Sequence, residues 1–256
     1  MSEQIVHYEV TNRIARISLN RPPVNALSLD LIRGVVAAFK RAAVDDTARA
    51  VVLSSTIARR FSAGLDLDIL LGKSGEESRK FLQELYINLY DAQYSLGKPS
   101  IAAINGAARG GGMTMAVSCD VVLAAESATF GYPEIDVGVL PAIHFVHLPR
   151  IVGRHRAFEL LFTGRTFDAK EARDLGVVNR VVSDNGLEIA AMEMAAVFAA
   201  KSETVVRLGR AAFMRQIDLD YRRSIAAAVD DFCNVAATDA AQEGLRAFVE
   251  KRQPRW

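Results

Sequence analysis

Three consecutive glycines and one isolated carboxylate are the residues whose types and spacing could support catalysis in this chain. Gly110, Gly111 and Gly112 precede a short apolar stretch that is typical of a buried helix. Glycines at the start of a helix allow backbone N–H groups to approach a ligand closely. Glu134 comes later, directly after Pro133 and in largely apolar surroundings. Backbone donors can hold a developing oxyanion while a carboxylate moves a proton, so this combination suits a reaction through an enolate.

Neither feature is specific when it is taken alone. Three glycines also form ordinary tight turns, and no Gly-Lys-Ser/Thr sequence follows them, which excludes a Walker A phosphate loop. A single glutamate such as Glu134 is more often a solvated surface acid than a catalyst. The functional interpretation therefore depends on a second motif and on the order in which the two motifs occur.

The second motif gives the chain a resemblance to one family. Residues 61–67, FSAGLDL, precede residues 98–141, KPSIAAINGAARGGGMTMAVSCDVVLAAESATFGYPEIDVGVLP. In sequence, order and separation the two motifs resemble the two halves of the site in the crotonase superfamily, the enoyl-CoA hydratases and isomerases. The resemblance extends from about Ile5 to Lys251. It implies an α/β fold with a crotonase-like spiral core of ββα units, a helical C-terminal region that forms trimers, and an acyl-CoA thioester substrate.

The resemblance also implies roles for individual residues. The backbone N–H groups of Ala63 and Gly111 would bind the thioester oxygen, and one such donor is worth roughly 3–4 kcal/mol in a dry site. Glu134 would move the proton. The residues that the resemblance places in contact with CoA are Val24, Ala63, Asp66, Leu67, Gly111, Phe248 and Lys251. CoA would enter as part of the substrate, and no separate cofactor is expected.

The residue at position 114 decides which reaction the resemblance favours. Hydratases of this family typically carry two glutamates, and the position of the first is occupied by Thr114, which cannot act as a base near neutral pH. Many Δ3,Δ2-enoyl-CoA isomerases of the family use a single glutamate that carries one proton from C2 to C4. The primary prediction is therefore an enoyl-CoA double-bond isomerase with Glu134 as its single base, and Thr114 stays among the candidate catalytic residues.

Three alternatives stay open. A hydratase or lyase would need Thr114 or a histidine to position water. Hydrolysis of a CoA thioester or of a β-diketone would need assistance from His144 or His147. A crotonase-fold protein that binds CoA without catalysis is the third alternative. A dienoyl-CoA isomerase is disfavoured, because Ala142 stands nearest the position of that subgroup's additional aspartate.

Other polar residues near Glu134 are expected to have structural roles. Asp136 is two residues away, so it points to the opposite side if the segment is extended. His144 and His147 are three residues apart and can share one face of a helix, but a metal site needs further ligands. We expect packing or pocket lining from these histidines, and no metal site.

The composition argues against several other classes of function. With 256 residues, of which 50% are hydrophobic, the chain can form one large core or a core with a small additional region. The net charge of +1 gives no support for nucleic-acid binding, and no apolar run is long enough for a membrane span. Cys119 and Cys233 lie in apolar segments, as expected of free thiols in a reducing compartment. Because the N-terminus has no apolar signal core, we expect a soluble cytoplasmic protein.

Hydrophobic patterns and capping residues predict alternating strands and helices, with a hairpin at the start. Strands are predicted at residues 6–10, 14–19, 51–53, 101–104, 121–124 and 177–182. Helices are predicted at residues 29–42, 81–94, 113–117, 156–162, 169–175, 187–200, 203–215, 219–237 and 240–251.

The composition shifts to alanine-rich helix near Asp184. We therefore predict a crotonase-like α/β core at residues 1–184 and a helical C-terminal region at residues 185–256. The C-terminal region is short of large apolar side chains for a core of its own, and the resemblance implies trimers. A homotrimer or a hexamer is expected.

Overall fold

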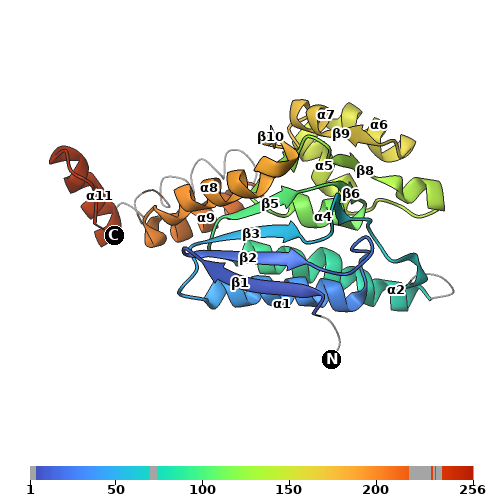
Figure 1. Ribbon diagram of the computed structural model, residues 1–256, viewed down its shortest axis with the longest axis horizontal. Helices are drawn as coiled ribbons and strands as arrows, with labels where there is room; N and C mark the ends of the chain where they lie inside the picture. The colour runs from blue at the N-terminus through green and yellow to red at the C-terminus, as the bar shows by residue number, and fades with distance from the viewer. Residues whose placement is uncertain (1–3, 70–73, 219–231, 233, 235–237, 256) are drawn as a thin grey trace.

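The chain forms two β-sheets with helices packed around them (Figure 1). The computed structural model describes residues 4–69, 74–218, 232, 234 and 238–255. Within these residues the larger sheet has six strands in the order β1-β2-β3-β5-β7-β10. These strands are β1 (Val6–Thr11), β2 (Ile14–Leu19), β3 (Ala50–Ser55), β5 (Ser100–Ile104), β7 (Val121–Ala125) and β10 (Arg180–Val182).

The larger sheet begins with a hairpin and continues with parallel strands. Strand β1 pairs antiparallel with β2, so that Val6 lies opposite Leu19. The neighbours β2 and β3, β3 and β5, β5 and β7, and β7 and β10 are all parallel. Parallel neighbours need crossover connections, and the helix between β2 and β3 provides one. The hairpin and the parallel order both confirm the pattern predicted from the sequence.

The smaller sheet consists of short strands that follow strands of the larger one. Strands β4 (Arg60–Ser62), β6 (Ala107–Arg109) and β8 (Thr129–Gly131) are mutually parallel neighbours, and β9 (Phe167–Asp168) pairs antiparallel with β8. In chain order β3 leads to β4, β5 leads to β6, and β7 leads to β8, and helical segments follow each pair. This repeated ββα order is the architecture that the resemblance implied.

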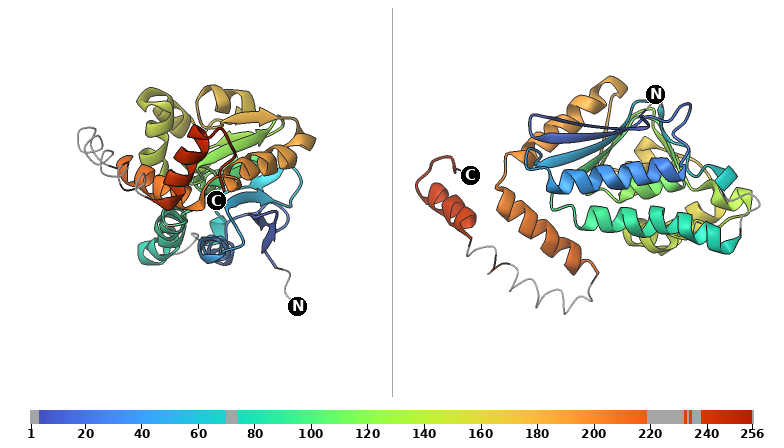
Figure 2. Two further views of the ribbon diagram at one scale, coloured as in Figure 1. Left: turned by 90° about the vertical axis from the view of Figure 1, so that its left-hand side faces the viewer. Right: turned by 90° about the horizontal axis from the view of Figure 1, so that it is seen from below.

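Two long helical segments lie side by side against one face of the larger sheet (Figure 2). Helix α1 (Leu29–Val44) begins where the Ser28 hydroxyl accepts a hydrogen bond from the Leu31 N–H, as predicted for an N-cap. The second segment is continuous but changes its winding. It consists of α2 (Gly75–Leu82), the π-helical stretch η2 (Gln83–Asn88) and α3 (Leu89–Tyr94).

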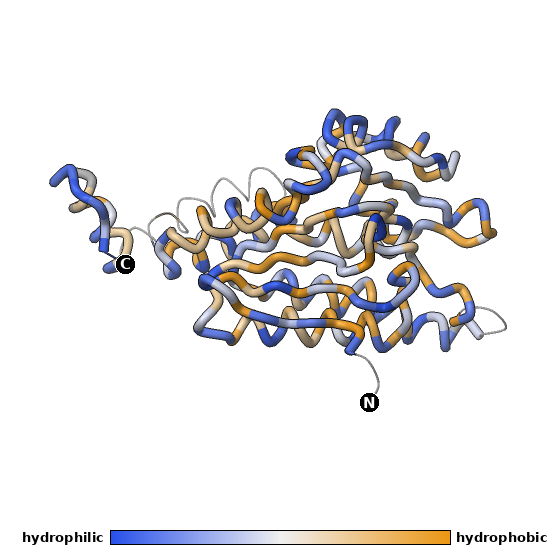
Figure 3. The backbone as a smooth tube through the Cα atoms, in the orientation of Figure 1, coloured by the Kyte–Doolittle hydropathy of each residue, from blue (hydrophilic) through white to orange (hydrophobic). Residues whose placement is uncertain are grey.

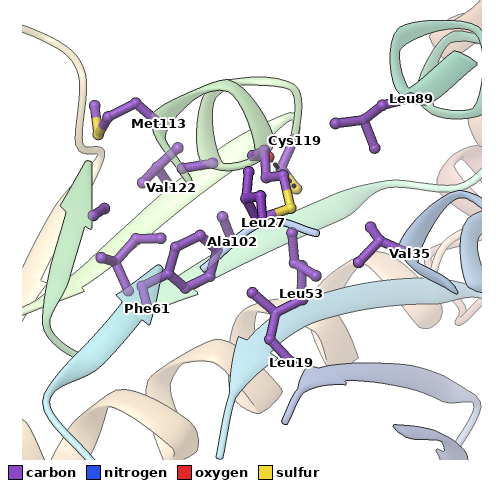
Figure 4. Packing of buried hydrophobic residues seen from close by; sticks show 14 of the residues in the cluster. Leu19, Leu27, Val35, Leu53, Phe61, Leu89, Ala102, Met113, Cys119 and Val122 are labelled. Atoms are coloured by element: carbon purple, nitrogen blue, oxygen red, sulfur yellow. Dashed lines mark hydrogen bonds between the residues drawn. The ribbon is translucent and has the colours of Figure 1, made fainter. Parts of the chain in front are cut away.

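Apolar side chains between the sheet and these helices form the main core. The hydrophobic colouring concentrates on the central strands (Figure 3). Leu19 and Leu53 extend from neighbouring strands toward Val35 of α1, and Phe61 of β4 joins the same cluster (Figure 4). These four side chains have no exposed surface. Burying such a side chain stabilises the fold by roughly 1.5–3 kcal/mol, so this cluster fixes where the strands end.

The remaining elements cover the other side and the two ends of the sheets. Helix α8 (Leu187–Ala199) packs against the opposite face of the larger sheet, where its Leu187 and Ala195 meet Val52 and Ile101. The remaining described helices are η1 (Leu67–Ile69), α4 (Gly111–Val117), η3 (Pro133–Val137), α5 (His144–Val152), α6 (Arg154–Thr163), α7 (Ala169–Asp174), η4 (Asp184–Gly186), α9 (Glu203–Gln216) and α11 (Asp239–Val249). None of the described helices is long and apolar enough to cross a membrane.

Most predicted elements agree with the structure, and two local differences have clear reasons. An extended segment at Glu134 was the condition for the expected orientation of Asp136, and this segment instead forms the 3₁₀ helix η3, which begins at Pro133. Proline suits a first helical position, because its missing N–H would have no partner there. The π-helical stretch was not expected, because its apolar spacing resembles that of an α-helix. The helix predicted at residues 219–237 lies almost wholly outside the described residues, as does Cys233. The predicted division at residue 184 stays a prediction.

Candidate active site

Three neighbouring parallel strands end where the candidate catalytic residues begin. Ala63 directly follows β4, Gly110 directly follows β6, and Glu134 follows β8 after two intervening residues. Because β4, β6 and β8 run in the same direction side by side, their carboxyl ends lie at one edge of the smaller sheet. Ligands of α/β proteins commonly bind outside the carboxyl ends of such strands. The topology therefore brings together residues that are far apart in the sequence.

Close backbone approach at this edge requires glycine at specific positions. A Cβ atom on Gly64 would lie 2.9 Å from the carbonyl oxygen of Arg109, so no side chain fits between the two loops. Gly110 has a φ of 45°, and a Cβ there would lie 2.5 Å from Oε1 of Glu134. A side chain at either position would push the loops or the carboxylate out of place. The glycine-rich motif thus lets Glu134 lie directly over the Gly110 backbone.

The two predicted oxyanion donors differ in their present hydrogen bonding. Gly111 is the first residue of α4, and its N–H has no acceptor among the residues that the structure describes. The Ala63 N–H donates to the carbonyl oxygen of Val24 at 3.0 Å. Binding of a thioester oxygen at Ala63 therefore requires this N–H to be shared with Val24 or released from it.

Glu134 is a largely buried carboxyl group with an unpaired oxygen. Only 13% of its side chain is exposed, and its Oε2 atom has no hydrogen-bond partner within the described structure. Burial raises the pKa of Glu134, because desolvation disfavours the charged form, although the residue's own backbone N–H partly opposes this. A carboxylate of this kind is well suited to accept a proton and to return it.

His144 and Thr114 complete the polar surroundings of Glu134. The Nε2 atom of His144 lies 3.2 Å from the Gly110 carbonyl oxygen, 3.4 Å from Oγ1 of Thr114 and 4.0 Å from Oε1 of Glu134. Both side chains are buried, and the His144 ring lies 4.5 Å from the ring of Tyr132 between centroids. Oγ1 of Thr114 and Oε1 of Glu134 thus both lie within 4.0 Å of one nitrogen atom.

Burial holds the His144 imidazole in its neutral form. Burial lowers the pKa of His144 to about 3, and the nearby His147 adds to this effect. The contact of Glu134 with His144 is therefore no ion pair, since desolvation outweighs the attraction between the two groups. Nε2 has only oxygen neighbours, whereas Nδ1 is buried without a partner, so the proton belongs on Nε2. That proton is directed to the Gly110 carbonyl.

The residues that the resemblance associates with CoA fall into two groups. Val24, Asp66 and Leu67 lie on the loops next to Ala63, and Asp66 accepts a hydrogen bond from Arg21 at 2.8 Å. Lys251 is exposed just after α11, whose place beside α9 is at the opposite end of the structure from β8 (Figure 1). The side chain of Phe248 lies outside the described part of the chain. The structure does not bring α11 to the site of its own chain.

A cavity of about 980 Å³ is lined by residues of η2, α3, α4, α5 and α9, and the candidate catalytic residues are not part of its lining. Tyr86 lines this cavity. Its phenol is close enough to Glu134 for the carboxylate to raise the pKa of Tyr86 further. Burial is the main cause of that shift and takes the pKa of Tyr86 to about 12. Val117 of α4 and His147 of α5 line the same cavity.

For other polar residues near the site, the expectations from the sequence can also be compared with the structure. Asp136 is exposed and lies beside Gly164, away from the glycine-rich turn. No group of three potential His, Cys, Asp or Glu metal ligands occurs within the described ranges. Tyr132, buried with an unpaired hydroxyl, was not identified as a site residue from the sequence, because no spacing signal distinguishes it from an ordinary core residue. Tyr86, next to Glu134, flanks the apolar stripe of its helix, so the sequence allows it to line an acyl pocket but favours helix packing.

The geometry defines a class of protein before any comparison is made. A free backbone N–H at the start of α4 lies beside a single buried carboxyl group with a raised pKa. Such a site can stabilise a negative oxygen while a neighbouring acid moves a proton, which is the chemistry of enolate-forming enzymes.

Comparisons with known proteins agree with this class. The profile of the family described as enoyl-CoA hydratase/isomerase matches residues 9–256. The chain is 34% identical to a probable enoyl-CoA hydratase of Bacillus subtilis over 246 residues, which cover 95% of each chain. It is 33% identical to a crotonyl-CoA hydratase of Syntrophomonas wolfei over 257 residues, which cover 99% of this chain and 98% of the relative. A solved enoyl-CoA hydratase of Mycobacterium smegmatis superimposes with a TM-score of 0.94 at 34% identity, covering 99% of both chains.

The chain belongs to the enoyl-CoA hydratase/isomerase family and has the crotonase fold. It is therefore an enzyme that acts on acyl-CoA thioesters. Members of this family typically use no separate cofactor. The fold and the family that the two sequence motifs predicted are both confirmed.

Proposed function

We propose that this enzyme hydrates 2-enoyl-CoA thioesters, with Glu134 as its single acid–base group and Thr114 as a partner that holds the water. The observation that carries this proposal is the arrangement around Nε2 of His144. The Glu134 carboxylate and the Thr114 hydroxyl lie 4.0 Å and 3.4 Å from this atom. A water molecule within reach of both the Glu134 carboxylate and the Thr114 hydroxyl would have an acceptor for its proton and a hydroxyl to hold it.

The reaction can be written with one carboxylate. The N–H groups of Ala63 and Gly111 bind the thioester oxygen and stabilise the enolate. Glu134 takes a proton from water while the hydroxide attaches to C3, and Glu134 then delivers a proton to C2. The product is a 3-hydroxyacyl-CoA, and the carboxylate is restored. CoA enters only as part of the substrate.

The comparisons support hydration over the isomerisation that the sequence favoured. The relatives from Bacillus subtilis and Syntrophomonas wolfei both have hydratase in their names. Isomerisation is the second candidate, because Glu134 is the carboxyl group that lies against the Gly110 backbone. For that reaction Glu134 alone would take a proton from C2 of a 3-enoyl-CoA and return it to C4.

The direct test supplies the purified enzyme with trans-2-enoyl-CoA and trans-3-enoyl-CoA in separate assays. Hydration removes the conjugated thioester absorbance and yields a 3-hydroxyacyl-CoA that chromatography detects. Conversion of the 3-enoyl substrate without hydration of the 2-enoyl substrate would establish the second candidate instead. Release of free CoA thiol would contradict both and indicate hydrolysis. Binding without any turnover would indicate a CoA-binding protein.

The proposed assembly is a homotrimer or a hexamer. Lys251 follows α11, which lies apart from the site of its own chain, so contact of this residue with CoA requires a second copy. Phe213 and Ile217 near the end of α9 are more than half exposed, as expected of a surface that another copy covers. A cytoplasmic location stays a prediction.

A further inference from the structure

His144 is a buried histidine that the proposed reaction does not use as an acid or a base. It begins α5, and only 2% of its side chain is exposed. Burying a polar ring at this depth costs free energy unless a hydrogen bond compensates. Of the two described hydrogen-bond contacts of Nε2, the shorter is the one to the Gly110 carbonyl at 3.2 Å, and the other is to Oγ1 of Thr114 at 3.4 Å.

The bonded carbonyl belongs to the peptide unit that carries the oxyanion donor. The Gly110 C=O and the Gly111 N–H are the two polar ends of one amide group. A donor that hydrogen-bonds to the carbonyl end polarises the whole amide and makes its N–H a stronger donor. His144 thus contacts the carbonyl end of the amide group whose N–H end faces the proposed thioester oxygen.

This peptide unit needs external support, because glycine occupies both of its sides. Neither Gly110 nor Gly111 has a Cβ atom to restrict rotation of the peptide plane. The Gly110 carbonyl also accepts hydrogen bonds from the N–H groups of Met113 at 2.8 Å and Thr114 at 3.2 Å. These backbone bonds belong to the first turn of α4, and His144 adds the one described side-chain donor from another helix.

We propose that His144 is a positioning residue that orients and polarises the Gly110–Gly111 peptide, and so tunes the oxyanion hole. The inference rests on the proposed enolate chemistry, but it concerns a different atom from the proton carrier. The neutral ring is suited to this role, since it donates through Nε2 without placing a positive charge beside Glu134.

The decisive experiment measures the thioester carbonyl directly. A saturated acyl-CoA labelled with carbon-13 at its thioester carbonyl is bound to the enzyme, and its carbonyl stretch is recorded by isotope-edited infrared spectroscopy. Wild type should lower the frequency relative to free ligand. His144→Leu should lose part of that shift and about tenfold in kcat, the upper range for one neutral hydrogen bond, with KM little changed. His144→Gln, which can still donate an N–H, should keep most of both.

Several outcomes separate this inference from the proposed function. A full frequency shift in His144→Leu, or equal losses in the Leu and Gln variants, would overturn the role of His144. Absence of any shift in wild type would instead reject the oxyanion hole and with it the proposed function. If the Leu variant does not fold, nitrogen-15 NMR of the wild-type imidazole decides the question. A hydrogen on Nε2 supports the inference, and a hydrogen on Nδ1 overturns it.

Discussion

Oε1 of Glu134 lies 4.0 Å from Nε2 of His144, and burial acts on the two groups in opposite directions. It raises the pKa of the carboxyl group and lowers that of the imidazole, so both are driven toward their neutral forms. The pair is therefore no salt bridge. The carboxyl group remains free to exchange a proton with a substrate, while the histidine stays neutral.

The first prediction concerns Glu134 itself. Glu134→Gln keeps the size of the side chain but cannot accept a proton, so turnover should fall by at least ~100-fold, the lower end for general-base catalysis. Affinity for a CoA thioester, measured by calorimetry, should change little. Asp136→Asn is the matched control, because Asp136 is an exposed acid two residues away, and it should keep wild-type turnover. Full activity in Glu134→Gln would rule out the single-glutamate mechanism.

The second prediction follows from the raised pKa of Glu134. Because the folded state binds this proton more tightly than the unfolded state, stability should fall as pH rises from about 4.3, the pKa of a free glutamate, through the raised folded pKa. Glu134→Gln removes the titration. The variant should therefore unfold at a higher temperature than wild type at neutral pH, and the difference should shrink below about pH 4. A constant difference at all pH values would show that the pKa of Glu134 is not raised.

The third prediction isolates the Gly111 N–H. Gly111→Ala and Gly111→Pro both add a Cβ, which would lie 2.7 Å from Cδ1 of Leu27, but only proline removes the donor. Proline is acceptable to the helix at this first position. Turnover should fall by about 100- to 1000-fold in the proline variant, the usual cost of losing one oxyanion donor, and far less in the alanine variant. Equal losses would mean that crowding against Leu27, and not the donor, limits activity.

The fourth prediction separates hydration from isomerisation at Thr114. Thr114→Ala removes the hydroxyl proposed to hold water, so it should slow hydration of 2-enoyl-CoA while isomerisation of 3-enoyl-CoA, if present, is largely kept. Thr114→Ser retains the hydroxyl and should keep hydration. The two rates are compared in the same preparation of each variant. Undiminished hydration in the alanine variant would remove Thr114 from the mechanism.

The fifth prediction concerns assembly. Light scattering should give three or six times the chain mass of 27.9 kDa. Phe213→Asp should weaken the assembly, because it places a charge on a side chain that is 63% exposed near the end of α9. A stable wild-type monomer at micromolar concentration would contradict the proposal that CoA is bound by residues from two copies.

Local sequence signals predicted much of the fold because they act over a few residues. The Ser28 and Asp168 caps begin α1 and α7 as expected, since each side chain accepts from an N–H three residues ahead. The alternation in residues 6–10 predicted the first strand of the hairpin that β1 and β2 form. Strands such as β4 and β8, with three residues each, are too short for any periodic pattern, and so the smaller sheet was not foreseen.

The candidate site was predicted less completely, because its contacts join distant residues. Ala63, Gly111 and Glu134 came from the family motifs, and the strand ends bring them to one edge of the smaller sheet. The bond from His144 to Gly110 spans 34 residues and carries no local signal. The partner of the Ala63 N–H, the Val24 carbonyl, depends on a backbone loop whose position no side-chain pattern encodes.

Two kinds of functional group lie near the ends of β4, β6 and β8, namely main-chain N–H donors and polar side chains. The turns that follow β4 and β6 supply the main-chain donors of Ala63 and Gly111, which are preserved by any substitution that leaves these turns in place. Helices α4, η3 and α5 supply the side chains Thr114, Glu134 and His144. Exchanging Thr114 or Glu134 changes how protons and water are handled without rebuilding the hold on the thioester, whereas His144 contacts the peptide that provides part of that hold. Single substitutions at Thr114, Glu134 or His144 can therefore change the reaction that this fold catalyses. A small library of variants at these three positions is a direct starting point for engineering a new activity.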